Sequence, residues 1–195
     1  QFSRSILKFD MIKHKFANMI TRAWESDTVN YATTGSIDEA IKKLDSSDHD
    51  YYVKMQKITE DHAIEASISK IVGSETLAYC ADEGVQIFGG SGFCEEYPAA
   101  GVYRDERINR IFEGTNEINR LIIAGTVLKK AILEEIPIRD VLLSRKLDMI
   151  GENNFENSIN KEAQVIEYCK SLGLIVLDNL ITIYGQDFKN KQWLI

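Results

Sequence analysis

The chain has 195 residues, of which 44% are apolar and 27% charged, and its two prolines are too few for a fold built from short strands and turns. A formal net charge of -7 without a cluster of Lys and Arg disfavours nucleic acid as a partner. Because no apolar run reaches the roughly 18 residues that a spanning helix needs, no transmembrane segment is expected.

The first predicted element is a long amphipathic helix over residues 4–44, whose apolar residues recur three or four positions apart. The polar run at residues 45–50 predicts a loop, and we expect this loop to extend to Asp61. A second helix is predicted over residues 62–89. Its apolar face widens from residue 77 onward, so its C-terminal half is expected to be largely buried.

A third helix is predicted over residues 116–133, with Thr115 as its N-cap. Pro137 is expected to open a fourth helix, because proline is tolerated at the first helical position. Residues 151–160 contain four Asn and are interpreted as a linker before one further amphipathic helix. The chain has neither an initiator Met nor a capped C-terminal helix, and we interpret both ends as boundaries of a fragment.

Six of the twelve glycines lie between Gly84 and Gly114. Within this segment, residues 86–93 predict a helix that ends in a turn containing three glycines. One interpretation is a left-handed cap that only stops the helix. The other is a set of exposed backbone amides that face a phosphate or a flavin chain. A Rossmann or Walker loop is not indicated, because those loops follow a strand and open a helix.

Glu113 lies between Phe112 and Gly114, just before the third predicted helix. One interpretation is a carboxylate favoured by the helix dipole, an effect of about 0.3–1 kcal/mol. The other is a general base. In that case the neighbouring Ile111 and Phe112 would raise the pKa of Glu113 by desolvation, and Gly114 would let a substrate approach the backbone. The residues by themselves leave both interpretations open.

Together these motifs resemble the C-terminal helical domain of acyl-CoA dehydrogenases. The resemblance rests on Gln86–Phe93, Glu96–Pro98, Arg104-Asp105 and the run RIFEGTNEINR at residues 110–120. Gln1-Phe2 and Ala66–Lys70 are similar to further family segments, so the resemblance covers residues 1–133. Residues 134–195 resemble the additional C-terminal segment of the very-long-chain branch.

The resemblance implies an all-α, four-helix up-down bundle over residues 1–133. Residues 134–195 would then form a linker and the start of an additional C-terminal helical segment. Family subunits also contain an N-terminal helical domain and a middle β-domain, so this chain would be the C-terminal domain fragment. The implied activity is the FAD-dependent α,β-dehydrogenation of fatty acyl-CoA thioesters, and the isolated fragment is expected to be inactive.

By its position in the motif, Glu113 corresponds to the base that removes the α-proton while a hydride leaves the β-carbon for flavin N5. Its backbone N–H would donate to the thioester carbonyl, and Gly114 would lie beside the bound thioester. The resemblance also implies FAD contacts. One contact falls at Gln1. A second group, which would contact FAD held largely by a partner subunit, is formed by Gln86, Ile87, Phe88, Gly89 and Gly90. A third group near the adenosine side of the cofactor is formed by Thr115, Asn116 and Glu117.

The implied partners are a fatty acyl-CoA substrate, an electron-transfer flavoprotein or similar acceptor, and further copies of the chain in a dimer or tetramer. Localisation would be cytoplasmic in a bacterium and the mitochondrial matrix in a eukaryote. Two alternatives remain open. One is a non-catalytic helical module of the same family that serves assembly or oligomerisation, and the other is an acyl-CoA oxidase-type flavoenzyme. The presence of Glu113 favours an enzyme.

Other residue types point to structural roles. The three cysteines form no CxxC pair, which disfavours a disulfide framework or zinc site and favours a reducing compartment. Cys94 and Cys169 are expected to be small core or half-buried residues. The three dispersed histidines are assigned to the surface, no metal is predicted, and Arg104-Asp105 is interpreted as an ion pair that fixes the turn before Glu113.

Overall fold

The computed structural model describes residues 2–148, 158–185 and 187, and all regular structure in this part of the chain is helical. The predicted all-α class is therefore confirmed. The α-helices are α1 (Asp10–Ile41), α2 (Tyr51–Asp61), α3 (Ala63–Phe88), α4 (Gly90–Phe93), α5 (Pro98–Glu106), α6 (Asn116–Ile132), α7 (Ile138–Asp148) and α8 (Ser158–Tyr184), and the 3-10 helices are η1 (Ile6–Lys8) and η2 (Arg107–Arg110).

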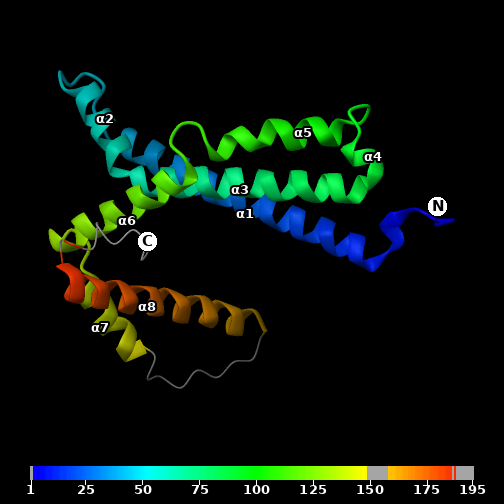
Figure 1. Ribbon diagram of the computed structural model, residues 1–195. Coiled ribbons are helices and arrows are strands. Elements are labelled where there is room, and N and C mark those ends of the chain that lie inside the picture. Colours follow the sequence, from blue (N-terminus) through cyan, green and yellow to red (C-terminus); the bar gives the residue numbers. More distant parts are fainter. Residues whose placement is uncertain (1, 149–157, 186, 188–195) are drawn as a thin grey trace. The chain divides into compact units, whose positions relative to one another are not determined.

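The chain divides into two compact units, Gln1–Ile123 and Ala124–Ile195. In the first unit, α3 packs between α1 and α5, and α3 runs opposite to both of them (Figure 1). The start of α6 lies against α3, where Asn116 hydrogen-bonds to Ser74. Helices α1, α3 and α5 form the antiparallel part of the expected bundle, while the predicted boundary between residues 133 and 134 stays a prediction.

Polar side chains link α1 to α3 at several points along their contact. The hydroxyl oxygens of Thr33 and Ser69 lie 3.1 Å apart, and the guanidinium of Arg22 stacks 4.2 Å from the centre of the Tyr79 ring. Lys15 forms an ion pair with Glu83 across the same contact.

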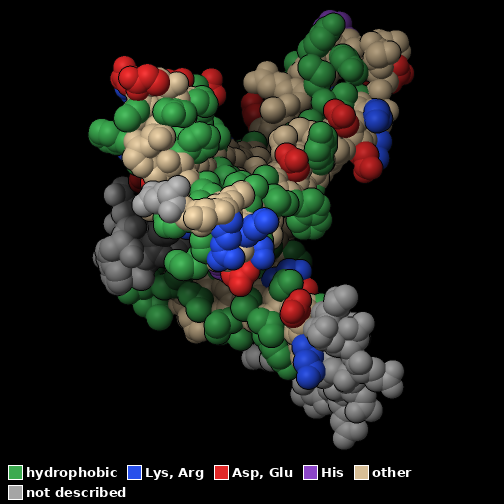
Figure 2. Space-filling model, turned by 90° about the vertical axis from the view of Figure 1, so that its right-hand side faces the viewer, with side chains coloured by type: hydrophobic (Ala, Val, Ile, Leu, Met, Phe, Trp, Pro, Cys, Tyr) green, Lys and Arg blue, Asp and Glu red, His purple; other side chains and the backbone are tan. Residues whose placement is uncertain are grey.

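Many large apolar side chains of the first unit lie at its surface. On α1, Ile20, Trp24 and Tyr31 are 67%, 69% and 75% exposed. Hydrophobic side chains are visible among the charged ones in the space-filling view (Figure 2). The predicted burial of the C-terminal half of α3 is also incorrect, because Leu77 and Phe88 remain 42% and 49% exposed. The surface that would cover these residues is not supplied by the described part of the chain.

The helix boundaries differ from prediction in two places. The first helix begins at Asp10 rather than residue 4, because Phe9 is extended and its ring packs edge-on against Phe2 at 5.7 Å. The predicted loop extending to Asp61 is wrong beyond residue 50, since α2 occupies residues 51–61. A helix at residues 51–61 brings oppositely charged side chains four residues apart into contact, as in the ion pair of Lys57 with Asp61 at 2.8 Å.

The other predicted helices agree more closely with the structure. Residues 62–89 contain α3, residues 116–133 contain α6, and α7 begins one residue after Pro137. Helix α5, opened by Pro98, was not predicted. Of the predicted linker at residues 151–160, residues 151–157 lie outside the described residues, and residues 158–160 belong to α8.

In the second unit, α7 packs against α8, and Ile138, Leu142 and Leu128 are buried. Arg139 Nε lies 3.3 Å from Asp178 Oδ1 and links the two helices. None of the described helices is both long enough and apolar enough to cross a membrane.

A buried ion pair near the end of α5 gives a stability prediction. Glu106 is 3% exposed and bonds to Arg110 at 3.1 Å, and its second carboxylate oxygen has no hydrogen-bond partner. Arg110→Met should lower the free energy of unfolding by about 3 kcal/mol, since it leaves a buried charge uncompensated. We place the effect at the low end of the known range because the Arg110 side chain is 35% exposed.

Arg104→Met is the matched control, since it removes an exposed pair with Glu95. Surface pairs contribute little to stability, so the denaturation midpoint should stay unchanged. Urea unfolding of this chain, followed by far-UV circular dichroism, measures both variants. Equal midpoints for the two variants would show that the Glu106–Arg110 pair adds nothing.

Candidate functional site

Glu113 lies in a sharp turn between η2 and α6. Its φ is +53° and that of Gly114 is +82°, so two consecutive residues adopt the left-handed region. This conformation costs a non-glycine residue roughly 1–2 kcal/mol and persists only when its surroundings hold it. Thr115 ends the turn as the predicted N-cap, because its hydroxyl accepts the N–H of Ile118 at 3.2 Å.

The Glu113 side chain is exposed. Ile111 and Phe112 are themselves 49% and 44% exposed, so they do not form the apolar surroundings that we expected to desolvate the carboxylate. That part of the prediction is wrong for this chain by itself. Within the described residues, the carboxylate makes neither a hydrogen bond nor an ion pair. Glu113 is therefore open to an external proton donor.

Two buried asparagines fix the first turn of α6. Asn119 is 8% exposed, and its Nδ2 donates to the carbonyl oxygens of Gly114 and Thr115, both at 3.0 Å. Asn116 is 3% exposed, accepts a bond from Lys70 Nζ at 2.6 Å and donates to Ser74 Oγ at 3.0 Å. The turn that carries Glu113 is thus tied to α3.

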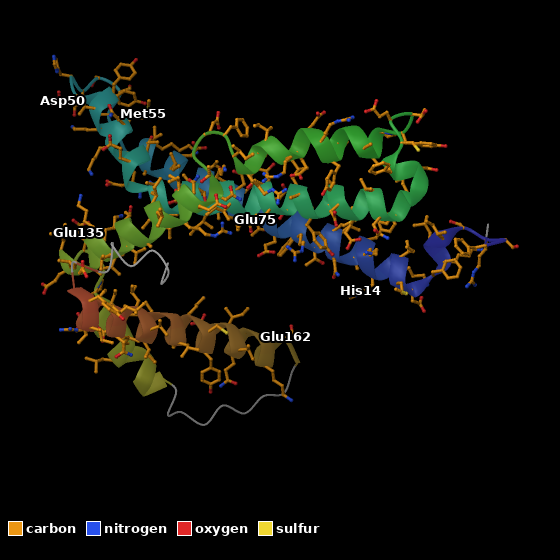
Figure 3. All side chains as sticks on the ribbon, viewed as in Figure 1. His14, Asp50, Met55, Glu75, Glu135 and Glu162 are labelled. Atoms are coloured by element: carbon orange, nitrogen blue, oxygen red, sulfur yellow. The ribbon has the colours of Figure 1, made fainter. Side chains whose placement is uncertain are left out.

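Glu117 and Glu75 extend the polar surroundings of this turn. Glu117 is exposed, and hydrogen bonds from its own backbone N–H and from the Thr115 hydroxyl hold the pKa of its carboxyl below the usual value. Glu75, which is labelled on α3 in Figure 3, accepts a bond from Asn116 at 3.4 Å and pairs with Arg120. In this turn, the Thr115 side chain is half-buried and the Glu117 side chain faces solvent.

The second predicted motif forms the turn that ends α3. Gly89 has φ +62°, and neither Gly89 nor Gly90 has an atom within 4 Å of the place where a Cβ would lie. Gln86 and Phe88 are exposed beside this turn, while Ile87 is half-buried. With φ +62° and ψ -142°, Gly89 does not have the left-handed helical conformation of the expected cap, and the turn leaves backbone that another molecule can approach closely.

Gly92, unlike Gly89 and Gly90, lies in a closely packed place. A Cβ at this position would lie 2.5 Å from the carbonyl oxygen of Val85 and 2.8 Å from Cβ of Phe88. Such distances force the backbone to move, which typically costs about 1–3 kcal/mol. Gly92→Ala should therefore destabilise the chain by that amount, measured by urea unfolding.

Gly90→Ala is the control, because its surroundings are open and its φ is not positive. It should leave the unfolding midpoint close to that of the unchanged chain. If Gly92→Ala were as stable as Gly90→Ala, the close packing between α4 and the end of α3 would not be needed.

The two groups of predicted cofactor residues lie far apart along α3. Gln86 is at the C-terminal end of α3, whereas Asn116 is bound to Ser74, twelve residues earlier. Twelve helical residues span about 18 Å, so the groups do not converge on one small pocket. Gln1, the remaining predicted contact, lies outside the described residues.

The structure differs from expectation at Arg104 and at two cysteines, and it adds two residues to the site. Arg104 donates to Glu95 at 2.8 Å and, within the described residues, makes no ion pair with Asp105, so the expected ion pair is replaced by one that ties α5 to the preceding loop. Cys94 and Cys169 are exposed rather than buried. Asn119 and Lys70 were not identified from the sequence, although an Asn on the apolar face of a helix is a signal for a specific bond.

A family model for the C-terminal domain of acyl-CoA dehydrogenases matches residues 1–128 of the chain. A probable acyl-CoA dehydrogenase from Bacillus subtilis is 35% identical over 195 residues, which is 98% of this chain and 33% of that protein. The human mitochondrial very long-chain specific acyl-CoA dehydrogenase is 37% identical over 124 residues, or 64% of this chain and 16% of that protein.

A crystal structure of an acyl-CoA dehydrogenase from Bacillus anthracis, complexed with FAD, has a similar fold. It superposes with a TM-score of 0.90 at 36% identity and covers 98% of this chain and 33% of that one. The present chain thus spans about a third of the length of its bacterial relatives.

Proposed function

This chain belongs to the acyl-CoA dehydrogenase family, and from that premise we propose that it supplies the catalytic base and part of the FAD surface of a dehydrogenase for fatty acyl-CoA thioesters. The observation that supports this most directly is the turn at Glu113. An exposed carboxylate without a partner stands on left-handed backbone, at the position that the family motif gives to its base.

The groups around Glu113 suit the removal of a proton next to a thioester. The backbone N–H of Glu113 makes no hydrogen bond within the described part of the chain, so it is free to donate to the thioester carbonyl. Such a bond makes the α-proton more acidic, because it stabilises the negative charge that develops on the oxygen. Gly114 has no side chain and lets the thioester lie against the turn. The Glu113 carboxylate then accepts the α-proton.

The residues present fit FAD at two separate places. Gly89 and Gly90 offer backbone without side chains, and Gln86 and Phe88 are exposed beside them. Because Asn116 is bonded to Ser74, about 18 Å along α3 from Gln86, we propose that the two groups contact different parts of the FAD surface, or FAD molecules held by two subunits. When bound, FAD supplies the acceptor for the hydride that leaves the β-carbon.

Asn116 fits a less direct role than the other proposed FAD contacts. Its side chain is buried and already bonded to Lys70 and Ser74, so it has no free group to offer to a cofactor. We propose that Asn116 contributes through its backbone and through the fixed position of its neighbours. Thr115 and Glu117 then provide the side-chain contacts.

The exposed apolar side chains of α1 support a larger assembly. Ile20, Trp24 and Tyr31 lie at the surface of this chain, and burial of such residues against other protein is favourable. We propose that the rest of the enzyme subunit, together with further copies in a dimer or tetramer, covers this face. The partner that reoxidises the flavin would be an electron-transfer flavoprotein or a similar acceptor.

Isotopic labelling of the substrate tests the proposed reaction. The full-length protein is mixed in a single turnover with acyl-CoA deuterated at the α-carbon, the β-carbon or the γ-carbon, and the loss of oxidised flavin absorbance is followed. Labels at the α- and β-carbons should slow reduction, because both C–H bonds break, and the γ-label should have no effect. Reduction that is insensitive to the α-label would overturn the assignment of Glu113 as a base.

A further inference from the structure

The backbone at Glu113 requires something to hold it. Glu113 and Gly114 both have positive φ, a conformation that a Glu residue rarely adopts. The backbone hydrogen bonds of the preceding turn end at Phe112, because the N–H groups of Ile111 and Phe112 both donate to the carbonyl of Ile108. Beyond Phe112 the turn needs a different support until α6 begins.

Asn119 provides that support. Its Nδ2 group has two hydrogens and lies 3.0 Å from the carbonyl oxygens of Gly114 and Thr115. Among the described residues, no other donor to the carbonyls of residues 112–114 is recorded. The bond to Gly114 therefore fixes the direction of the peptide that follows the left-handed pair. A Cβ on Gly114 would come within 3.3 Å of the same Nδ2, which shows how closely the amide is packed on the turn.

The Asn119 amide is itself attached to a fixed frame. It is buried, and one turn earlier Asn116 joins α6 to α3 through Lys70 Nζ at 2.6 Å and Ser74 Oγ at 3.0 Å. The second carbonyl that Asn119 binds, that of Thr115, also accepts the Asn119 backbone N–H at 2.9 Å. Asn119 is thus fixed both through its side-chain amide and through its backbone N–H, and its bond to Gly114 fixes the peptide next to Glu113.

We infer that Asn119 is a positioning residue that holds the Glu113 turn in the geometry needed for removal of the α-proton. This inference rests on the proposed function. It predicts that loss of the amide donor misplaces the Glu113 carboxylate while leaving FAD and acyl-CoA binding nearly intact. A misplacement of about 1 Å at a reacting group is enough to lower a rate about 100-fold.

The test uses the full-length enzyme with Asn119→Ala, Asn119→Asp and Asn119→Gln. Asn119→Ala and Asn119→Asp both lack the amide donor and should lower kcat roughly 10- to 100-fold, with FAD content and the KM for acyl-CoA close to those of the unchanged enzyme. The kinetic isotope effect of an α-deuterated substrate on kcat should rise, because proton removal becomes slower than the other steps. Asn119→Gln keeps the amide and should recover most of the lost kcat.

Asn179→Ala is the matched control, because Asn179 also donates its Nδ2 to a backbone carbonyl four residues earlier, at 2.9 Å, but lies on α8. It should leave kcat and the isotope effect unchanged. The inference is overturned if the folded Asn119 variants have the same kcat and isotope effect as Asn179→Ala. It is also overturned if Asn119→Gln and Asn119→Ala lose equal activity together with FAD, since that marks a purely structural role.

A parallel Glu113→Gln variant separates this inference from the proposed function. Severe loss of turnover in Glu113→Gln with normal kcat in Asn119→Asp would overturn the positioning role alone. Normal turnover in Glu113→Gln would overturn the proposed function, and the positioning role with it.

Discussion

Glu113→Gln in the full-length enzyme should lower turnover by about 10²- to 10⁴-fold, the typical contribution of a general base. An amide has nearly the shape of a carboxylate but does not accept the α-proton. Because the Glu113 side chain is exposed and without a partner in the described chain, its replacement should disturb neither folding nor the turn. FAD content should remain close to that of the unchanged enzyme.

Steady-state dye reduction and the ratio of flavin to protein absorbance measure these two quantities. Glu65→Gln is the control, because Glu65 is also an exposed carboxylate and lies at the start of α3, away from the turn. Its turnover should be unchanged. If Glu113→Gln loses FAD, or keeps normal turnover, then Glu113 is a structural residue and not the base.

The isolated 195-residue chain should purify colourless and show no acyl-CoA-dependent dye reduction, even when FAD is added. The proposed contacts at residues 86–90 and 115–117 are about 18 Å apart, so each would touch only part of a bound FAD. The rest of the cofactor would stay in water. Such partial contact does not offset the loss of translational and rotational freedom on binding, estimated at roughly 4–15 kcal/mol.

The same chain should self-associate in solution. Trp24 and Tyr31 are 69% and 75% exposed, and large apolar patches favour burial against another copy when their normal cover is absent. Analytical ultracentrifugation with absorbance at visible and ultraviolet wavelengths measures mass and flavin content together. A yellow monomer with one FAD per chain would show that this bundle alone forms the cofactor site.

The long helices could be predicted from the sequence, because their apolar residues repeat at helical spacing. The missed elements are short or polar. Helix α2 was missed because the polar run at residues 45–50 was extended as a loop, although Tyr51, Met55 and Ile58 recur at helical spacing and are half-buried. Helix α5 begins at Pro98 within a glycine-rich segment, where local signals favour loops. The start of α1 depends on a contact between Phe2 and Phe9, which spacing alone does not reveal.

For the candidate site, the sequence identified the position of Glu113 and the turn at Gly89, but not what holds them. The left-handed backbone at Glu113 is stabilised by Asn119, and its helix is joined to α3 by Lys70, 46 residues earlier than Asn116. Such contacts depend on tertiary structure. The expected desolvation of Glu113 also failed for this chain, because it requires cover that Ile111 and Phe112 do not give.

We propose above all that this chain completes the active site of an FAD-dependent acyl-CoA dehydrogenase. The most direct test mixes the full-length, FAD-loaded protein with saturated fatty acyl-CoA in the absence of oxygen and of any other acceptor. We expect loss of the oxidised flavin absorbance and one enoyl-CoA formed for each flavin reduced. Bound FAD that stays oxidised while acyl-CoA occupies the enzyme would contradict it.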